Sequence, residues 1–507
     1  MLNSDRLLGR RYAAVRKDGD SKVPGAALLI VGLATLFRLV AAARIPLTED
    51  EAYYWSWSRH LAFGYLDHPP AIAWAIASTS FLGRSPLAVR LSSIVFEALA
   101  ALALGRTARL LAGNARAEIA AVTIFTLLPE PRLLIGEALP DGPFLFFWAL
   151  TLWLAVRATK WPAPRTMALL GLALGGALLS RYFGWPLLAG VVAYSLAPER
   201  RSLWKHGFWI APLVAAIVYA PFIVWNATHD WINLAFTLVN RQMPHAFSIA
   251  SIFYYSTLRT FVVGLVLWVV AYYTVIRPRY TLLAWTALPF ASLLLLLAFF
   301  ETVESYWLLG PLASLCVGIG IAYARRPQRA RRLWALLWAL PVAYSLATVM
   351  FWVVPQGLQA SILRASHEGL KGPLYSSVYV YEPLAAQTRS LVAPRGAAVL
   401  TNEYEIASEL AFNGLSPLIV GSAPQVAQWR MWNASPIPAR ALVLTFLPIA
   451  RTPGFERLLE HAFARVSPGP TLRYTFAGTS EGTFYSTWCS RPVRDAAVIL
   501  YGRFNDL

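Results

Sequence analysis

The sequence contains little charge and much hydrophobic surface. Only 14% of its 507 residues are Asp, Glu, Lys or Arg, whereas a soluble domain has about 25%. Hydrophobic residues make up 57% of the chain, which also contains 20 tryptophans. We therefore expect most of the chain to lie in lipid rather than to fold around a water-facing core.

Cysteine is nearly absent. Cys316 lies in an apolar run and Cys489 far away in a polar region, so we do not expect them to form a disulfide bond. The sequence also has no Cys/His spacing that is typical of a metal site. These absences exclude a disulfide framework and a zinc-finger type of fold.

The net charge of +18 could indicate a nucleic-acid partner. The basic residues, however, form short patches between apolar segments, as they do in membrane proteins. We therefore predict no nucleic-acid partner and expect contact with membrane lipids. The basic first 24 residues resemble the start of a signal peptide, but the long apolar array that follows indicates a retained first membrane helix.

Eleven apolar runs are candidates for membrane spans, because about 20 apolar residues cross a hydrocarbon core about 30 Å thick. The fifth and sixth runs are separated only by Ser180, Arg181 and Tyr182. The runs lie near residues 25–43, 86–104, 117–135, 142–157, 166–180, 183–197, 207–225, 257–276, 281–300, 305–324 and 332–354.

Lys and Arg cluster in alternate loops, and nearly all acids lie in the other loops. The positive-inside rule therefore places the N-terminus in the cytoplasm and the C-terminal end outside. We predict a basic cytoplasmic segment over residues 1–24 and a transmembrane domain over 25–354, with a catalytic outer loop at 44–85. Residues 355–507 are polar enough for a soluble α/β domain, with strands near 398–401 and 440–445.

The first outer loop contains the stretch LTEDEAYYWSWSRHLAFGYLDHPP, residues 47–70, which combines carboxylates with aromatic rings. Thr48 and Glu51 have the spacing of a capping box, so a simple interpretation is a capped helix on the bilayer surface. Because Gln also serves in a capping box, Glu51→Gln is expected to cost little stability. Asp50 is not needed for the cap, and a carboxylate held at the lipid surface suits general-base catalysis.

These residues resemble a signature of GT-C glycosyltransferases of the protein-mannosyltransferase and lipid A aminoarabinose-transferase type. Further similar pieces follow in order: LPDGPFLFFWAL (139–150), ALLSRYFGWPLL (177–188), WNATHDWINLAF (225–236), ESYWLLGPL (304–312) and NEYEIASELAF (402–412). The resemblance implies a GT-C fold, a polyprenyl-phosphate sugar as donor, and transfer that inverts the anomeric centre. It also implies that Asp50 is the catalytic carboxylate, with Glu51 beside it and Asp141 in the second outer loop.

A polyprenyl-phosphate leaving group departs as a stable anion, so a cation that faces it is more useful than a general acid. Arg181 is the first candidate, because SRY resembles the family's Ser-Lys-Tyr and Arg adds a bidentate fork. Its alternative role is to anchor a helix end. Arg259 is a second candidate for the phosphate site.

Other residues are assigned to the substrate loop or to structure. Arg38 and Glu97 lie inside the first two spans, where a structural pair or a snorkelling arginine would account for them. A divalent metal ion is not required by this chemistry, although the outer carboxylates could hold one. The predicted substrate-loop residues are Tyr54, Asp67, His68, Tyr182, Tyr306 and Trp307.

The sequence thus predicts a multi-pass protein of the bacterial inner membrane that transfers a hexosyl or pentosyl group on the periplasmic side. The acceptor could be lipid A or the lipopolysaccharide core, another surface glycan, or a protein. A transporter or flippase of a lipid-linked saccharide is the alternative, but it would favour broken helices with charges near the midplane. The acids lie in the outer loops instead, which favours an enzyme.

Overall fold

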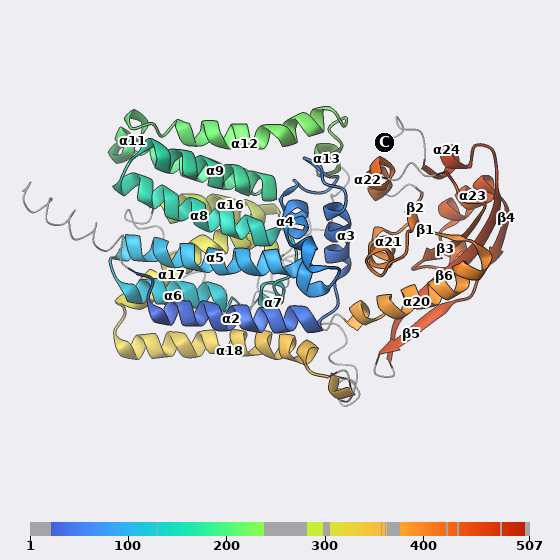
Figure 1. Cartoon of the computed structure of the whole chain (residues 1–507). Helices are drawn as coiled ribbons and strands as arrows, with labels where there is room; N and C mark the ends of the chain where they lie inside the picture. The colour runs from blue at the N-terminus through green and yellow to red at the C-terminus, as the bar shows by residue number, and fades with distance from the viewer. Residues whose placement is uncertain are drawn as a thin grey trace, which may run out of the picture.

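The computed structural model describes most of the chain. The described residues are 22–128, 130–237, 281–297, 305–355, 357–359, 361, 376–421, 424–432, 436–476 and 479–501. The predicted span at 257–276 lies outside them. The described parts form a helical bundle followed by an α/β region built on a sheet (Figure 1).

Apolar helices lie side by side in the bundle (Figure 1). They are α2 (Gly25–Arg44), α5 (Pro86–Ala112), α6 (Ala115–Thr126), α8 (Asp141–Lys160), α9 (Pro164–Ser180), α10 (Gly184–Leu196), α12 (Ile210–Ala227), α16 (Thr281–Leu297), α17 (Leu309–Arg325) and α18 (Gln328–Val353). By length and composition, α2, α5, α8, α12 and the segment Tyr306–Arg325 can each cross a membrane. The protein is a multi-pass membrane protein.

The predicted span at 117–135 is not one continuous helix. It consists of α6, which ends at Thr126, and the short helix α7 (Pro131–Ile135). Pro131 stands in the first turn of α7, where its missing N–H removes no helical hydrogen bond. The same residue could not extend α6, because a proline inside a helix interrupts the hydrogen-bond ladder.

The ends of the helices follow local signals. Ser85 caps α5 and Pro86 begins it, while Gly113 ends it with a φ of 73°, a left-handed conformation that glycine adopts without strain. Between α9 and α10 the helix is broken at Arg181–Phe183, as the sequence predicted. Arg38 of α2 and Glu97 of α5 form a buried ion pair at 2.9 Å, which confirms the predicted structural pair.

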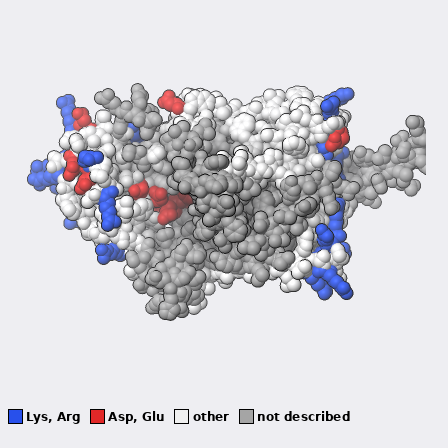
Figure 2. All heavy atoms as spheres, turned by 180° about the vertical axis from the view of Figure 1, so that it is seen from behind, with Lys and Arg blue, Asp and Glu red and all other residues white. Residues whose placement is uncertain are grey.

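Lys and Arg gather at the end of the bundle that lies away from the sheet (Figure 2). Between the two ends, the described part of the bundle surface in this view carries few charges, as expected for a lipid-facing belt. The described basic residues at this end come from the helix ends and connections: Arg106, Arg109, Arg116, Arg157, Lys160, Arg165, Arg200, Arg201, Lys205, Arg325, Arg326, Arg329, Arg331 and Arg332.

The sheet has the order β2-β1-β3-β6-β4, and β5 pairs with β6. Strands β1 to β3 are parallel, and β6 runs antiparallel to β3, β4 and β5. The strands are β1 (Ala398–Thr401), β2 (Leu418–Ile419), β3 (Arg440–Thr445), β4 (Phe463–Pro468), β5 (Leu472–Phe476) and β6 (Thr479–Pro492). The predicted strands near 398–401 and 440–445 are therefore present.

Both faces of the central strand β3 are covered. Leu442 and Leu444 belong to one apolar cluster and Ala441 and Val443 to another, which explains the continuous apolar run of this strand. The helices of this region are α20 (Tyr381–Val392), α21 (Tyr404–Phe412), α22 (Gln425–Trp432), α23 (Pro453–Ala462) and α24 (Ala496–Tyr501).

Residues 44–85, the predicted first outer loop, join the bundle to the sheet region. They contain α3 (Glu49–Ser58) and α4 (Ala71–Thr79), and α3 lies between the bundle and α21 (Figure 1). Tyr53 and Trp57 of α3 share one apolar cluster with Ala407 of α21 and Trp429 of α22. The packing of these side chains fixes α3 against both parts of the protein.

Candidate active site

Helix α3 begins with the predicted capping box. The Thr48 hydroxyl accepts a hydrogen bond from the Glu51 backbone N–H, and the Glu51 carboxylate accepts one from the Thr48 N–H at 3.0 Å. Glu49, Asp50 and Glu51 therefore occupy the first turn, where the helix dipole favours negative charge. The cap holds three carboxylates in fixed and different directions.

Glu51 points into the protein. Both its side chain and that of Arg90 are 0% exposed, and Arg90 donates to the two carboxylate oxygens at 2.7 and 2.5 Å. The Ala138 N–H donates to the same carboxylate at 2.9 Å. Arg90 also donates to the carbonyls of Ile45 and Pro46. The pair thus joins the start of the outer loop to α5 and to the segment before α8.

This geometry overturns the expectation that Glu51→Gln would cost little stability. The substitution keeps the capping geometry but leaves the buried Arg90 guanidinium without its counter-charge. Breaking a buried pair from one side typically costs about 3–5 kcal/mol. The sequence offered no local signal for this partner, because Arg90 lies 39 positions along the chain.

Asp50 lies on the other side of α3 and is half-buried. The Tyr404 hydroxyl of α21 donates to its carboxylate at 3.4 Å. Burial raises the pKa of Tyr404, and the charges of Asp50 and Asp67 raise it further. The phenol therefore stays protonated, and the Asp50 carboxylate keeps exposed surface through which it can reach a substrate.

Acidic side chains of α21 face the same junction. Burial raises the pKa of Glu405 to about 7, and the charges of Glu403 and Glu49 contribute to the rise. Burial raises the pKa of Glu409 well above its usual value, with further contributions from Glu49 and Glu51. Space-filling atoms show acids gathered where the bundle meets the sheet region (Figure 2). No role was predicted for these α21 acids from the sequence.

Asp141 and Arg181 form a second buried ion pair. Asp141 is the first residue of α8 and is 3% exposed; Arg181 directly follows α9 and is 4% exposed. A guanidinium N–H of Arg181 donates to the Asp141 carboxylate. The sequence predicted these residues in separate roles, and the structure brings them together.

A further basic residue and an aromatic ring complete this part of the site. The guanidinium carbons of Arg132 and Arg181 lie 4.7 and 5.3 Å from the centre of the Tyr306 ring. Arg132 also pairs with Glu137 at 3.8 Å, and burial raises the pKa of Glu137 to about 7.

The other predicted substrate-loop residues lie around these groups. Tyr54 and the buried His68 have ring centres 6.1 Å apart. Burial raises the pKa of Tyr182, and the negative charge of Asp67 raises it further. The same charge also raises the pKa of Tyr404. Trp307 instead packs on Phe183, with ring centres 5.8 Å apart.

Arg259, the second candidate for the phosphate site, lies outside the described residues. Within the residues that the structure describes, no three Asp, Glu, His or Cys side chains are arranged to hold a metal ion.

Known proteins resemble this chain in sequence and in fold. Residues 67–225 match the family model described as dolichyl-phosphate-mannose-protein mannosyltransferase. A lipid A galacturonosyltransferase of Rhizobium johnstonii, RgtD, is 34% identical over 217 residues, which cover 41% of this chain and 44% of that protein. The match thus spans less than half of this curated relative.

The fold extends over nearly the whole chain. The apo structure of ArnT from Cupriavidus metallidurans covers 90% of this chain and 97% of its own, with a TM-score of 0.61 and 14% identity. The structure of the same protein bound to undecaprenyl phosphate gives the same TM-score with 15% identity. By its fold, and by the family model that matches residues 67–225, the chain resembles the GT-C glycosyltransferases.

Proposed function

We propose that the protein transfers a sugar from a polyprenyl-phosphate donor to a hydroxyl group of a cell-envelope acceptor. The observation that carries the proposal is the position of Asp50. A capping box and a buried ion pair hold the start of α3, yet the Asp50 side chain keeps exposed surface at the junction of bundle and sheet. A rigidly placed, accessible carboxylate at the membrane surface suits a general base.

In the proposed reaction, Asp50 accepts the proton of the acceptor hydroxyl as that oxygen forms a bond to the anomeric carbon. The bond between this carbon and the phosphate oxygen breaks, and polyprenyl phosphate leaves as an anion. Because attack and departure occur on opposite faces, the configuration inverts. No general acid is needed, since phosphate is a stable leaving group.

Arg181 is proposed to stabilise the departing phosphate. Asp141 holds its guanidinium in place, and Arg132 lies on the same Tyr306 ring, so two cations converge on this part of the site. Preorganised cations in a dry site stabilise developing negative charge more strongly than they would in water. Glu51 is proposed to position the loop through Arg90 rather than to touch the acceptor.

The donor and acceptor classes follow from the relatives. ArnT has been solved with undecaprenyl phosphate, which supports a polyprenyl-phosphate donor. The name of RgtD supports lipid A as the acceptor and a hexuronosyl group as the sugar. We propose a lipid A or core glycan of a bacterial inner membrane, modified on the periplasmic side.

The orientation has its own test. The basic end of the bundle (Figure 2) is proposed to face the cytoplasm. A reporter fused at Arg329 should then be cytoplasmic, and one fused at Asn402 external. Two fusions on the same side would contradict this orientation.

The proposed function is tested by Asp50→Asn. Asn keeps the size of the side chain, and Thr48 still caps α3, so the protein should fold normally. The rate of label transfer from donor to lipid A, with both saturating, should fall about 10²–10⁴-fold, the usual contribution of a positioned general base. A folded variant within a few-fold of the wild-type rate would refute the role of Asp50. Flux of the lipid-linked sugar across liposomes without transfer would favour a flippase.

A further inference from the structure

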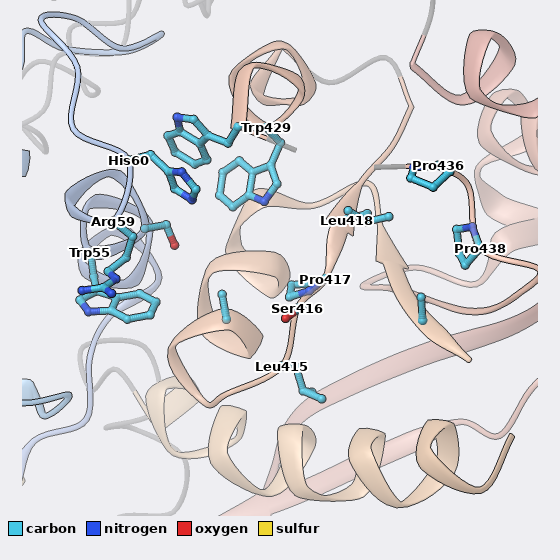
Figure 3. A pocket seen from close by; sticks show the side chains of 14 residues that line it. Trp55, Arg59, His60, Leu415, Ser416, Pro417, Leu418, Trp429, Pro436 and Pro438 are labelled. Atoms are coloured by element: carbon cyan, nitrogen blue, oxygen red, sulfur yellow. The ribbon is translucent and has the colours of Figure 1, made fainter. Parts of the chain in front are cut away.

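A cavity lies beside α3, on the side of the sheet (Figure 3). It has a volume of about 560 Å³. Its walls come from α3 and its C-terminal end, from α21 and the loop after it, and from α22. We call it the α3–sheet cleft; its lining residues are Trp55, Ser56, Arg59, His60, Ala398, Ala411, Leu415, Ser416, Pro417, Leu418, Trp429, Trp432, Pro436 and Pro438.

Helix α3 presents different side chains to the two sites. Asp50 and Glu51 lie in its first turn, whereas Trp55 and Arg59 lie one turn apart near its C-terminal end and face the cleft (Figure 3). His60 follows directly. The helix that carries the proposed base therefore also forms one wall of the cleft.

Aromatic rings line the cleft, and we call those of His60, Trp429 and Trp432 its aromatic platform. The rings of His60 and Trp432 are stacked, with centres 4.7 Å apart and an interplanar angle of 9°. Trp429 contacts Trp432 at 4.9 Å, and Trp55 packs against Phe412 at 5.2 Å. Flat aromatic rings beside an open volume match the apolar C–H face of a pyranose ring, while its hydroxyls remain free for hydrogen bonds.

The charge of the cleft is positive. Arg59 is exposed, and its side chain makes no hydrogen bond or ion pair with another residue that the structure describes. None of the lining residues is acidic. Burial lowers the pKa of His60, and the charge of Arg59 lowers it further, so His60 is neutral near pH 7 and can donate or accept. Guanidinium groups bind phosphate and carboxylate through paired hydrogen bonds.

The cleft is connected to Asp50 by packed aromatic rings. Trp429 lies parallel to Tyr53 at 5.8 Å, and Tyr53 contacts Tyr404 at 4.7 Å. Tyr404 in turn donates to Asp50. Because Tyr53 and Trp429 are buried, these rings form a packed layer between the cleft and the proposed base.

We propose that the α3–sheet cleft binds the saccharide of an anionic glycan acceptor. The aromatic platform contacts a sugar ring, and Arg59 holds a phosphate or carboxylate group of the acceptor. This proposal rests on the proposed function and specifies its acceptor site. It also assigns specificity for the acceptor to residues that differ from those of the donor site.

The test uses the full-length protein in detergent. The probe is a core-extended lipid A, which carries phosphate and sugar-acid carboxylate groups, and the same lipid after enzymatic dephosphorylation. Trp432→Ala and Arg59→Gln should each raise the Kd and the acceptor KM by roughly tenfold, which corresponds to about 1.4 kcal/mol. The donor KM should not change.

Matched controls separate this effect from general damage. Trp209→Ala removes an exposed tryptophan at the far end of the bundle, and Arg465→Gln removes an exposed arginine of β4; neither should change binding. An Arg59 effect that disappears with the dephosphorylated lipid identifies phosphate as its partner, and one that persists identifies a carboxylate.

The proposal is overturned if both cleft variants bind the probe as tightly as wild type, or if the wild-type protein binds neither form. The first outcome leaves the proposed function intact, provided that Asp50→Asn still abolishes transfer. Conversely, binding that depends on Trp432 and Arg59 without any sugar transfer would refute the proposed function and retain the glycan site.

Discussion

Replacing Glu51 by Gln should destabilise the protein far more than its position at a helix cap suggests. The Glu51 carboxylate accepts hydrogen bonds from two nitrogens of Arg90 and from the N–H groups of Thr48 and Ala138. Gln keeps one oxygen and turns an NH₂ group towards these donors. Because both side chains are fully buried, the unpaired guanidinium should cost about 3–5 kcal/mol.

The assay is a thermal melt of purified protein in detergent, with the rate of sugar transfer measured on the folded fraction. At about 2–4 °C per kcal/mol, the melting temperature should fall by about 6 °C or more. Arg90→Gln alone should be as harmful, because it leaves the Glu51 carboxylate unpaired.

The double variant Glu51→Gln, Arg90→Gln is the control for this reasoning. It removes both buried charges, so it should be less destabilised than the sum of the two single variants. Single variants that melt within 1–2 °C of wild type, or strict additivity in the double variant, would refute the account of the pair.

Three other predictions follow from the site. Arg181→Ala should raise the donor KM and lower the turnover, whereas Arg181→Lys should retain much of the activity because a point charge remains; equal donor dependence in Ala and wild type would make Arg181 only an anchor. Glu405 has a pKa raised to about 7, so its folded state binds more protons than its unfolded state between about pH 4.5 and 7, and the stability of the protein should fall over this window as pH rises. Glu405→Gln should therefore raise the melting temperature at pH 8 and have little effect near pH 4; an equal gain at both pH values would contradict this. Treatment with EDTA should leave the transfer rate unchanged, since neither the leaving group nor the described carboxylates call for a metal ion, and loss of activity that Mg²⁺ or Mn²⁺ restores would disprove this.

The sequence predicted features that depend on near neighbours. The capping box of α3, the break at Arg181 and the strand of residues 398–401 each follow from signals within a few residues. The break after α6 was missed, because the span at 117–135 was identified from its overall apolar character, although Pro131 marks the interruption.

The pairing of charges could not be predicted in the same way. Glu51 and Arg90 are 39 positions apart, and Asp141 and Arg181 are 40 positions apart; no periodicity specifies which of several charges near the helix ends become partners. The pair of Arg38 and Glu97 could be predicted from the sequence, because two opposite charges inside adjacent spans have few other ways to be neutralised. The motif NEYEIASELAF was recognised in the sequence. The positions of Tyr404, Glu405 and Glu409 next to the proposed site could not be predicted, because they depend on the packing of α21 against α3.

The Arg38–Glu97 pair has a consequence for the biogenesis of the protein. An arginine near the middle of an isolated helix costs about 2.5–3.5 kcal/mol on translocon insertion scales, and Arg38 lies well inside α2. Its guanidinium bonds to Glu97 and to the carbonyls of Leu133 and Thr126, all of which are synthesised later. The first helix should therefore be held at the translocon until α5, the end of α6 and α7 emerge, so that the four segments enter the lipid as one unit.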